Sequence, residues 1–166
     1  MRYKQLANSD LNVSEITLRS MTFGQQNTMA DACAQLDFAF AQGVNFIDTA
    51  EMYPVPARAE TQGRTEEYVG QWLRRQARDK VIIGSKVAGP ARGMGWIRNG
   101  PESLDRANIT AAIEGSLKRL QTDYIDLYQI HWPARNVPMF GKNNYNPALE
   151  RPSTSVEEQL TVFGEL

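Results

Sequence analysis

The sequence predicts an α/β protein of the (β/α)8 TIM-barrel type, here the first four βα units (a half-barrel) behind a short β-hairpin. Short apolar strands alternate strictly with helical segments, and the composition is ordinary for a globular protein, with 42% hydrophobic residues. Strict alternation implies a parallel sheet with right-handed crossovers. Because a complete barrel takes about 250 residues, these 166 residues are expected to form half of one as a single domain over 1–166. A small open doubly wound sheet fits the same pattern.

The first two units follow from caps and apolar runs. Two short extended segments within residues 1–14 predict the hairpin, and a first short strand is expected to end at residues 21–24. Thr28 and Asp31 have the spacing of a capping box, and Gly43 is placed to end that helix. The helix has an apolar face made of Cys33, Leu36 and Phe40, and the strand after it is expected over 44–48.

The last two units are read in the same way. A helix opens at Thr65 with Val69, Trp72 and Leu73 as its apolar positions, and a strand covers 81–86. Asp105 is expected to cap the third helix, and a fourth strand covers 124–130. Ser155 with Glu158 predicts a second capping box, opening the fourth helix, within which the chain ends. The stripe of the third helix is Ile109, Ile113, Leu117 and Leu120.

Composition argues against several classes of partner. The net charge is −1 with both signs scattered, which disfavours nucleic acid and anionic membranes as main partners. The amino-terminal residues lack the apolar segment of a signal peptide, and no apolar run is long enough to span a bilayer. The single cysteine, Cys33, has no partner for an internal disulfide, and no Cys/His cluster has zinc spacing. We therefore expect a cytoplasmic protein without a metal site.

Three predicted strands end on an ionisable residue, namely Asp48, Lys86 and His131. Function in a parallel barrel lies at this carboxyl edge, and a charge after an apolar run is otherwise costly to bury. Tyr53 follows Asp48 by five residues, in the loop above the same edge. Taken singly, each has an ordinary explanation as a turn cap, a solvated strand end, a loop anchor or a core histidine. Taken together, the four favour one site.

The four side chains suit proton transfer. Asp48 and Lys86 are expected to form an ion pair, and the Lys86 cation is expected to lower the pKa of Tyr53 and make it a better proton donor near neutral pH. His131 can donate a hydrogen bond to a substrate carbonyl. This set can protonate an alkoxide as it forms, so the partner that it lacks is a source of hydride.

Two loops surround this edge. Trp132, Phe140 and Tyr145 either rim an apolar pocket or pin the loop 133–154 to the barrel, and the sequence does not separate the two. The loop 88–104 holds glycines that match neither a P-loop nor a dinucleotide fingerprint, so we expect them to give flexibility. They are Gly89, Gly93 and Gly95.

Residues 45–53, 84–86 and 116–133 resemble the signature regions of the aldo-keto reductase superfamily. The resemblance covers the whole chain in order, and it is closest to the bacterial Tas-type branch, which has similar stretches at 50–56 and 140–142. It implies a barrel without a Rossmann domain, NADPH/NADP+ bound in extended form, and reduction of aldehydes and ketones, which are small carbonyl substrates.

The resemblance also implies roles for individual residues. The catalytic tetrad would be Asp48, Tyr53, Lys86 and His131, with Tyr53 as the general acid. The cofactor would be touched by Ser20, Met21 and Asp48, and the substrate by Tyr53, His131 and Trp132.

The chain departs from the family in two ways. Arg19 stands where the family usually has glycine, so it would either crowd the site or extend its head into solvent. The later strands that hold the nicotinamide amide, the pyrophosphate and the 2′-phosphate are absent from these 166 residues. We therefore expect weak turnover or none from the isolated chain.

Two other functions stay open at this stage. One is a half-barrel that self-associates through its open edges, and the other is a non-enzymatic regulatory or interaction protein with the same fold.

Overall fold

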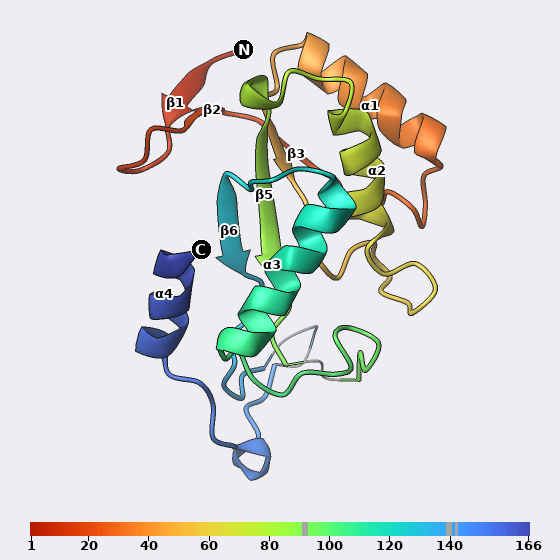
Figure 1. The fold of residues 1–166 in the computed structure, drawn as a ribbon. Helices are drawn as coiled ribbons and strands as arrows, with labels where there is room; N and C mark the ends of the chain where they lie inside the picture. The colour runs from red at the N-terminus through yellow and green to blue at the C-terminus, as the bar shows by residue number, and fades with distance from the viewer. Residues whose placement is uncertain (91–92, 139–140, 142) are drawn as a thin grey trace.

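The computed structural model describes residues 1–90, 93–138, 141 and 143–166. Its main sheet is parallel, has the order β3-β4-β5-β6, and carries a helix after each strand (Figure 1). The strands are β3 (Thr17–Arg19), β4 (Phe46–Asp48), β5 (Ile82–Val87) and β6 (Leu127–Ile130). The helices are α1 (Met29–Ala41), α2 (Arg64–Leu73), α3 (Arg106–Leu120) and α4 (Val156–Glu165). The predicted alternation is confirmed, and the architecture is that of a partial (β/α)8 barrel.

The smaller elements also follow the expected order. Strands β1 (Tyr3–Gln5) and β2 (Asn12–Ser14) form the predicted antiparallel hairpin. The described residues form two 3-10 turns, η1 (Arg78–Lys80) before β5 and η2 (Pro147–Leu149) before α4. No helix in the described part of the chain is long and apolar enough to cross a membrane.

Most helices begin where their caps predict. Thr28 and Asp31 form the full capping box of α1, and Asp105 accepts from the backbone N–H of the third residue of α3. Ser155 accepts from Glu158 N at 3.1 Å, which is the first half of the predicted box at α4. Gly43 follows α1 with a φ of +87°, a left-handed conformation that ends the helix at low steric cost.

The largest differences from the predicted strand boundaries are at β3 and β6. β3 ends at Arg19, not at residues 21–24, because the chain turns at Thr22, whose carbonyl accepts from Gln26 N at 3.0 Å. β6 begins at Leu127 instead of 124. Just before it, Ile83 N donates to the Asp126 carboxylate at 2.8 Å, so a side chain takes the place of a ladder carbonyl there.

Helices α1, α2 and α3 lie side by side against one face of the sheet (Figure 1). The core between them contains Ile47 and Ile83 from the strands, packed against buried side chains such as Leu36, Trp72 and Leu120. Helix α4 packs beside α3 and β6, where the Phe163 and Tyr128 rings stack with their centroids 5.5 Å apart. This face is therefore covered along its length.

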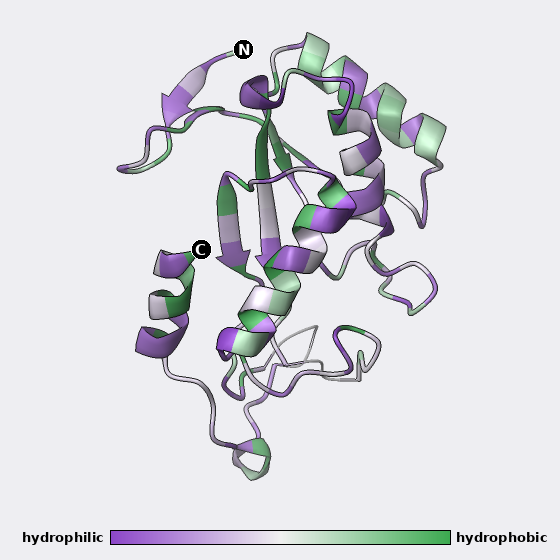
Figure 2. Ribbon diagram, viewed as in Figure 1, coloured by the Kyte–Doolittle hydropathy of each residue, from purple (hydrophilic) through white to green (hydrophobic). Residues whose placement is uncertain are grey.

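The other face of the sheet is the one that would line a barrel interior. The hairpin closes its amino-terminal end, where Val13 packs against Phe46 and Ile82. Toward the carboxyl end the face becomes polar, and β5 turns from hydrophobic to hydrophilic along its length (Figure 2). A hollow of about 460 Å³ lies on this face; its lining is Leu6, Thr17, Arg19, Phe46, Asp48, Leu127 and Gln129.

Candidate functional site

Strand register places the predicted strand-end residues on one face. Asp48 pairs with Gly84 across β4 and β5, so Lys86, two residues later, lies on the same face and nearer the carboxyl edge. Lys86 pairs with Gln129 across β5 and β6, which brings His131 to the same face by the same two-residue step. The structure thus gathers these side chains at the carboxyl edge of the sheet.

The ion pair between Lys86 and Asp48 lies at the centre of this group. Lys86 Nζ donates to Asp48 Oδ1 at 2.6 Å and to the Thr49 carbonyl at 2.7 Å. Burial holds the pKa of Lys86 below its usual value, and the hydrogen bond and charge of Asp48 oppose that fall. The predicted pair is therefore formed, with two of the three ammonium donors used.

Tyr53 lies above this pair, on a loop tied down at both sides. Its backbone N–H donates to the Ala50 carbonyl at 3.0 Å, and its carbonyl accepts from Gly63 N at 2.8 Å. The residue is only 2% exposed, and its ring centroid is 5.4 Å from Lys86 Nζ. Burial raises the pKa of Tyr53. The prediction that Lys86 lowers this pKa is wrong, because desolvation of the phenolate outweighs the cations and the cation that opposes it most is Arg19.

Arg19 contacts the tyrosine hydroxyl directly. Its Nε and Nη2 donate to Tyr53 Oη at 3.1 and 2.8 Å, and its Nε lies 3.6 Å from Asp48 Oδ2. From the sequence, Arg19 was considered only as a departure from the family glycine, and this contact was not predicted. The structure places Arg19 at the end of β3, where the register pairs it with Asp48. The expectation of a strand that ends at residues 21–24 gave no signal for this contact.

His131 stands beside Tyr53 with its ring nearly perpendicular and the two centroids 5.5 Å apart. Its backbone N–H donates to the Val87 carbonyl at 3.0 Å, which fixes its position after β6. Burial, with Lys86 and Arg19 adding to it, lowers the pKa of His131 to about 4. The imidazole is therefore neutral at neutral pH. Its Nδ1 is buried and has no hydrogen-bond partner among the described residues.

The predicted cofactor residues lie next to these groups. Ser20 is fully buried, and both its backbone N–H and its hydroxyl donate to the Asp48 carbonyl, at 3.0 and 2.8 Å. Met21 is half-buried against the apolar cluster that contains Tyr53, and its carbonyl accepts from Val55 N at 2.8 Å. Among the described residues no group of three His, Cys, Asp or Glu side chains could hold a metal ion.

Trp132 is buried in the loop cluster and donates from its indole Nε1 to the Pro90 carbonyl at 3.2 Å. It also lines a pocket of about 400 Å³, so both sequence interpretations apply to it. Tyr145 is exposed, and Phe140 lies outside the described residues. The pocket lining is Ile130, His131, Trp132, Pro133, Ala134, Arg135, Ser153, Thr154, Ser155, Val156 and Gln159.

Gly89 serves packing more than flexibility. A Cβ built there would lie 2.5 Å from the Trp132 carbonyl oxygen, a distance that real contacts do not reach. The expectation that all three loop glycines give flexibility is therefore wrong for Gly89, because the backbone must approach Trp132 closely. Gly93 and Gly95 have open space around them.

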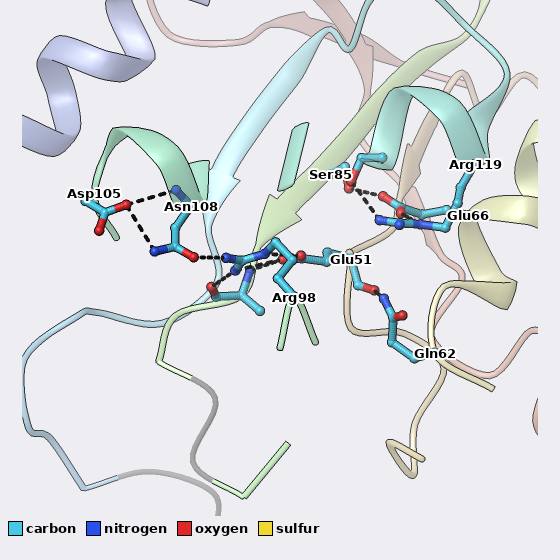
Figure 3. A network of polar contacts seen from close by, with 10 residues as sticks. Glu51, Gln62, Glu66, Ser85, Arg98, Asp105, Asn108 and Arg119 are labelled. Atoms are coloured by element: carbon cyan, nitrogen blue, oxygen red, sulfur yellow. Dashed lines mark hydrogen bonds and ion pairs between the residues drawn. The ribbon is translucent and has the colours of Figure 1, made fainter. Parts of the chain in front are cut away.

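Glu51 is a functional-site neighbour that the sequence did not reveal. It is buried on the loop between Asp48 and Tyr53, and it accepts from Ala88 N at 2.7 Å and pairs with Arg98 (Figure 3). Arg98 also donates to the Ala88 carbonyl at 2.8 Å and to Asn108 Oδ1 at 2.9 Å. This network ties the Tyr53 loop to the end of β5 and to α3.

A second buried carboxylate, Glu66 of α2, anchors the helices behind the sheet. Ser85 donates to it at 2.6 Å, and Arg119 of α3 pairs with it at 2.7 Å (Figure 3). The side chain of Ser85 points toward the helices, whereas that of the next residue, Lys86, reaches Asp48 on the other face. Glu66 therefore braces β5 from behind.

Comparisons with known proteins identify proteins that are similar to this chain. The model of the aldo/keto reductase family matches residues 15–166. Protein tas of Escherichia coli (strain K12) is 52% identical over 166 residues, which cover 99% of this chain and 48% of that protein. A probable voltage-gated potassium channel subunit beta of Oryza sativa subsp. japonica is 35% identical over 144 residues, 84% of this chain and 40% of that protein.

The chain is also similar to solved structures. The crystal structure of a thermostable aldo-keto reductase, Tm1743, in complex with the inhibitor epalrestat superposes with a TM-score of 0.70 and 29% identity, covering 99% of this chain and 49% of that one. The chain spans about half the length of the curated relatives that it matches.

His131 is the single histidine, so its titration can be followed alone. We expect its imidazole proton resonance in NMR to titrate near pH 4, against an ordinary pKa of 6.5. Between these values the unfolded chain binds more protons than the folded one, so His131 contributes stability above pH 6.5 that is lost as the pH falls toward 4. The variant His131→Phe should therefore lose less stability than the parent between pH 7 and 5 in urea unfolding. A midpoint near 6.5 would contradict the buried, neutral imidazole.

Arg98→Met should destabilise the chain by about 3–5 kcal/mol, because it leaves the buried carboxylate of Glu51 without its cation. The matched control is Arg106→Met, which removes an ion pair whose side chains are 57% and 52% exposed, and which should destabilise the chain far less than Arg98→Met. Urea unfolding measures both. Equal losses in the two variants would show that the Glu51 pair has no special weight.

Proposed function

The chain belongs to the aldo/keto reductase family, and from this premise we propose that it carries the carbonyl-reducing site of an NADPH-dependent oxidoreductase that converts aldehydes and ketones to alcohols. The observation that carries the proposal is the ion pair of Lys86 and Asp48 beneath the phenol of Tyr53, with the neutral ring of His131 beside it. We propose a cytoplasmic location for the same protein.

Tyr53 acts as the general acid in this proposal. Because burial raises its pKa, the phenol keeps its proton at neutral pH and has one to give. As negative charge develops on the substrate's carbonyl oxygen, the Tyr53 hydroxyl would transfer its proton there. The product is the alcohol, and the phenolate later regains a proton from water.

His131 and the ion pair orient and stabilise this step. A neutral imidazole has one N–H, which donates to the carbonyl oxygen and fixes the direction of the substrate. Lys86 places its positive charge near the Tyr53 ring, and Asp48 holds the Lys86 ammonium group in position. Trp132, at the edge of the pocket beside His131, would contact the substrate.

The residues present fit the reactive end of the cofactor. The donor set of Asp48, Tyr53, Lys86 and His131 supplies a proton and hydrogen bonds but no hydride, and hydride is what NADPH supplies when bound. Ser20, Met21 and Asp48 border the end of β3 and β4, and they are the residues that would contact the nicotinamide. Because the chain spans about half the length of its relatives, we propose that it turns over weakly or not at all alone.

A second candidate function is self-association or a regulatory role. β3 and β6 are the outer strands of the main sheet, each bonded to one neighbour in it, and proteins normally cover such edges. A second copy could close the ring, and a purely monomeric species in light scattering would exclude this. The rice relative carries the name of a channel subunit, which supports a non-enzymatic role as the alternative to turnover.

Tyr53→Phe tests the proposed general acid. The chain is joined to the part of the Escherichia coli relative that it does not match, and aldehyde reduction is followed by the loss of NADPH absorbance. We expect the variant to lose about 10²- to 10⁴-fold in kcat, because proton donation is removed, while NADPH still quenches the tryptophans with similar affinity.

The matched control for this test is Tyr124→Phe, which removes a hydroxyl from a tyrosine that is 41% exposed and should leave the rate unchanged. Reduction by Tyr53→Phe at close to the parental rate would contradict the assignment.

A further inference from the structure

We propose that Arg19 is a positioning residue that holds the Tyr53 hydroxyl and sets the acidity of its phenol, a role that rests on the proposed function of Tyr53 as the general acid. Arg19 ends β3, pairs in register with Asp48, and reaches over the sheet to the oxygen of Tyr53.

Two N–H groups of the Arg19 guanidinium converge on the Tyr53 oxygen, and we call this two-donor contact the fork. Two guanidinium N–H groups of Arg19 donate to Tyr53 Oη, at 3.1 Å from Nε and 2.8 Å from Nη2. The same Nε lies 3.6 Å from Asp48 Oδ2, so the guanidinium bridges the phenol and the carboxylate. The two hydrogen bonds fix the position of the Tyr53 oxygen and the rotation of its ring, and the contact with Asp48 holds the guanidinium in place.

Lys86 does not fill this role. Its Nζ donates to Asp48 Oδ1 at 2.6 Å and to the Thr49 carbonyl at 2.7 Å, and it lies 5.4 Å from the centroid of the Tyr53 ring. In the described part of the chain, the cation that hydrogen-bonds the phenol oxygen is therefore Arg19.

The charged groups around Tyr53 act in opposite directions. From β3, Arg19 lowers the pKa of Tyr53 through its hydrogen bond and its charge, whereas burial and Asp48 of β4 raise it. Lys86 of β5 adds a second positive charge nearby, and His131 after β6 is neutral. Because N–H donors bind a phenolate more strongly than a phenol, Arg19 favours the state that Tyr53 reaches once its proton has left.

The fork also directs the proton. A phenol oxygen has two acceptor positions and one O–H. The donors of Arg19 occupy the acceptor side of Tyr53, so the O–H points away from the guanidinium and toward another acceptor. In the proposed reaction that acceptor is the substrate carbonyl oxygen.

The test is the acid dissociation constant of Tyr53 in the 166-residue chain, measured by NMR with tyrosine labelled at the ring carbon that bears oxygen. Tyr53→Phe identifies the resonance. We compare the parent with Arg19→Gly, Arg19→Gln and Arg19→Lys. We expect the constant to fall by at least about threefold in the Gly and Gln variants, and by less in Lys, which keeps the charge but loses the fork.

The matched control is Arg58→Gln, which removes the same charge from an exposed position on the loop between β4 and α2. This change should leave the acid dissociation constant of Tyr53 unchanged. Because the Arg19 side chain is 58% exposed, its replacement should not unfold the chain, and circular dichroism checks this. An equal constant in the parent, Arg19→Gly and Arg19→Gln would overturn the proposal. An equal fall of the Tyr53 acid dissociation constant in Arg58→Gln would also overturn it, because the effect would then come from net charge alone.

The titration needs neither cofactor nor substrate, so it is independent of turnover. A fall in the constant together with a fully active Tyr53→Phe variant would reject Tyr53 as the general acid and keep the contact of Arg19. An unchanged constant in an active reductase would reject the role of Arg19 alone.

Discussion

The ion pair between Lys86 and Asp48 joins the carboxyl ends of β4 and β5 on the face of the sheet that the helices leave open. Both side chains are largely buried, and removing one partner of such a pair leaves a charge that typically costs about 3–5 kcal/mol. A second N–H of Lys86 donates to the Thr49 carbonyl. The Asp48 carbonyl accepts from both the backbone N–H and the hydroxyl of Ser20. These contacts hold the strand ends in fixed positions beneath Tyr53.

In the proposed reaction, the chemistry of the site depends on an excess of positive charge around Tyr53. Arg19 and Lys86 are cationic, Asp48 is anionic, and His131 stays neutral because its pKa is lowered to about 4. Burial makes the phenol of Tyr53 a weaker acid, and Arg19 offsets part of that effect. In the proposed reaction, this balance would keep the proton on Tyr53 in the resting site and favour its departure when charge develops on a substrate oxygen. The network of Glu51 and Arg98 holds the loop on which Tyr53 lies, so the position of Tyr53 depends on a second buried ion pair.

Local features of this fold were predictable from sequence, and contacts between distant segments were not. Thr28 and Asp105 mark helix starts correctly because a cap is set by residues three apart. Asp48 and Lys86 were placed together because parallel strands share one carboxyl edge. The contact of Arg19 with Tyr53 depends on the course of the loop after β4, and no spacing rule encodes it. Other contacts were missed for the same reason: the Glu51–Arg98 pair spans 47 residues, and the need for glycine at 89 comes from Trp132, far along the chain.

The most direct test of this account is a double-mutant cycle on the central ion pair, built from Asp48→Asn, Lys86→Met and the double variant, with the free energy of unfolding measured in urea. Each single change leaves a buried polar group without its partner, whereas the double change removes both charges. The account predicts that the double variant loses less stability than the sum of the single losses, by at least about 1 kcal/mol. Losses that simply add would show that Asp48 and Lys86 do not depend on each other and would contradict the ion pair as the organising interaction of the site.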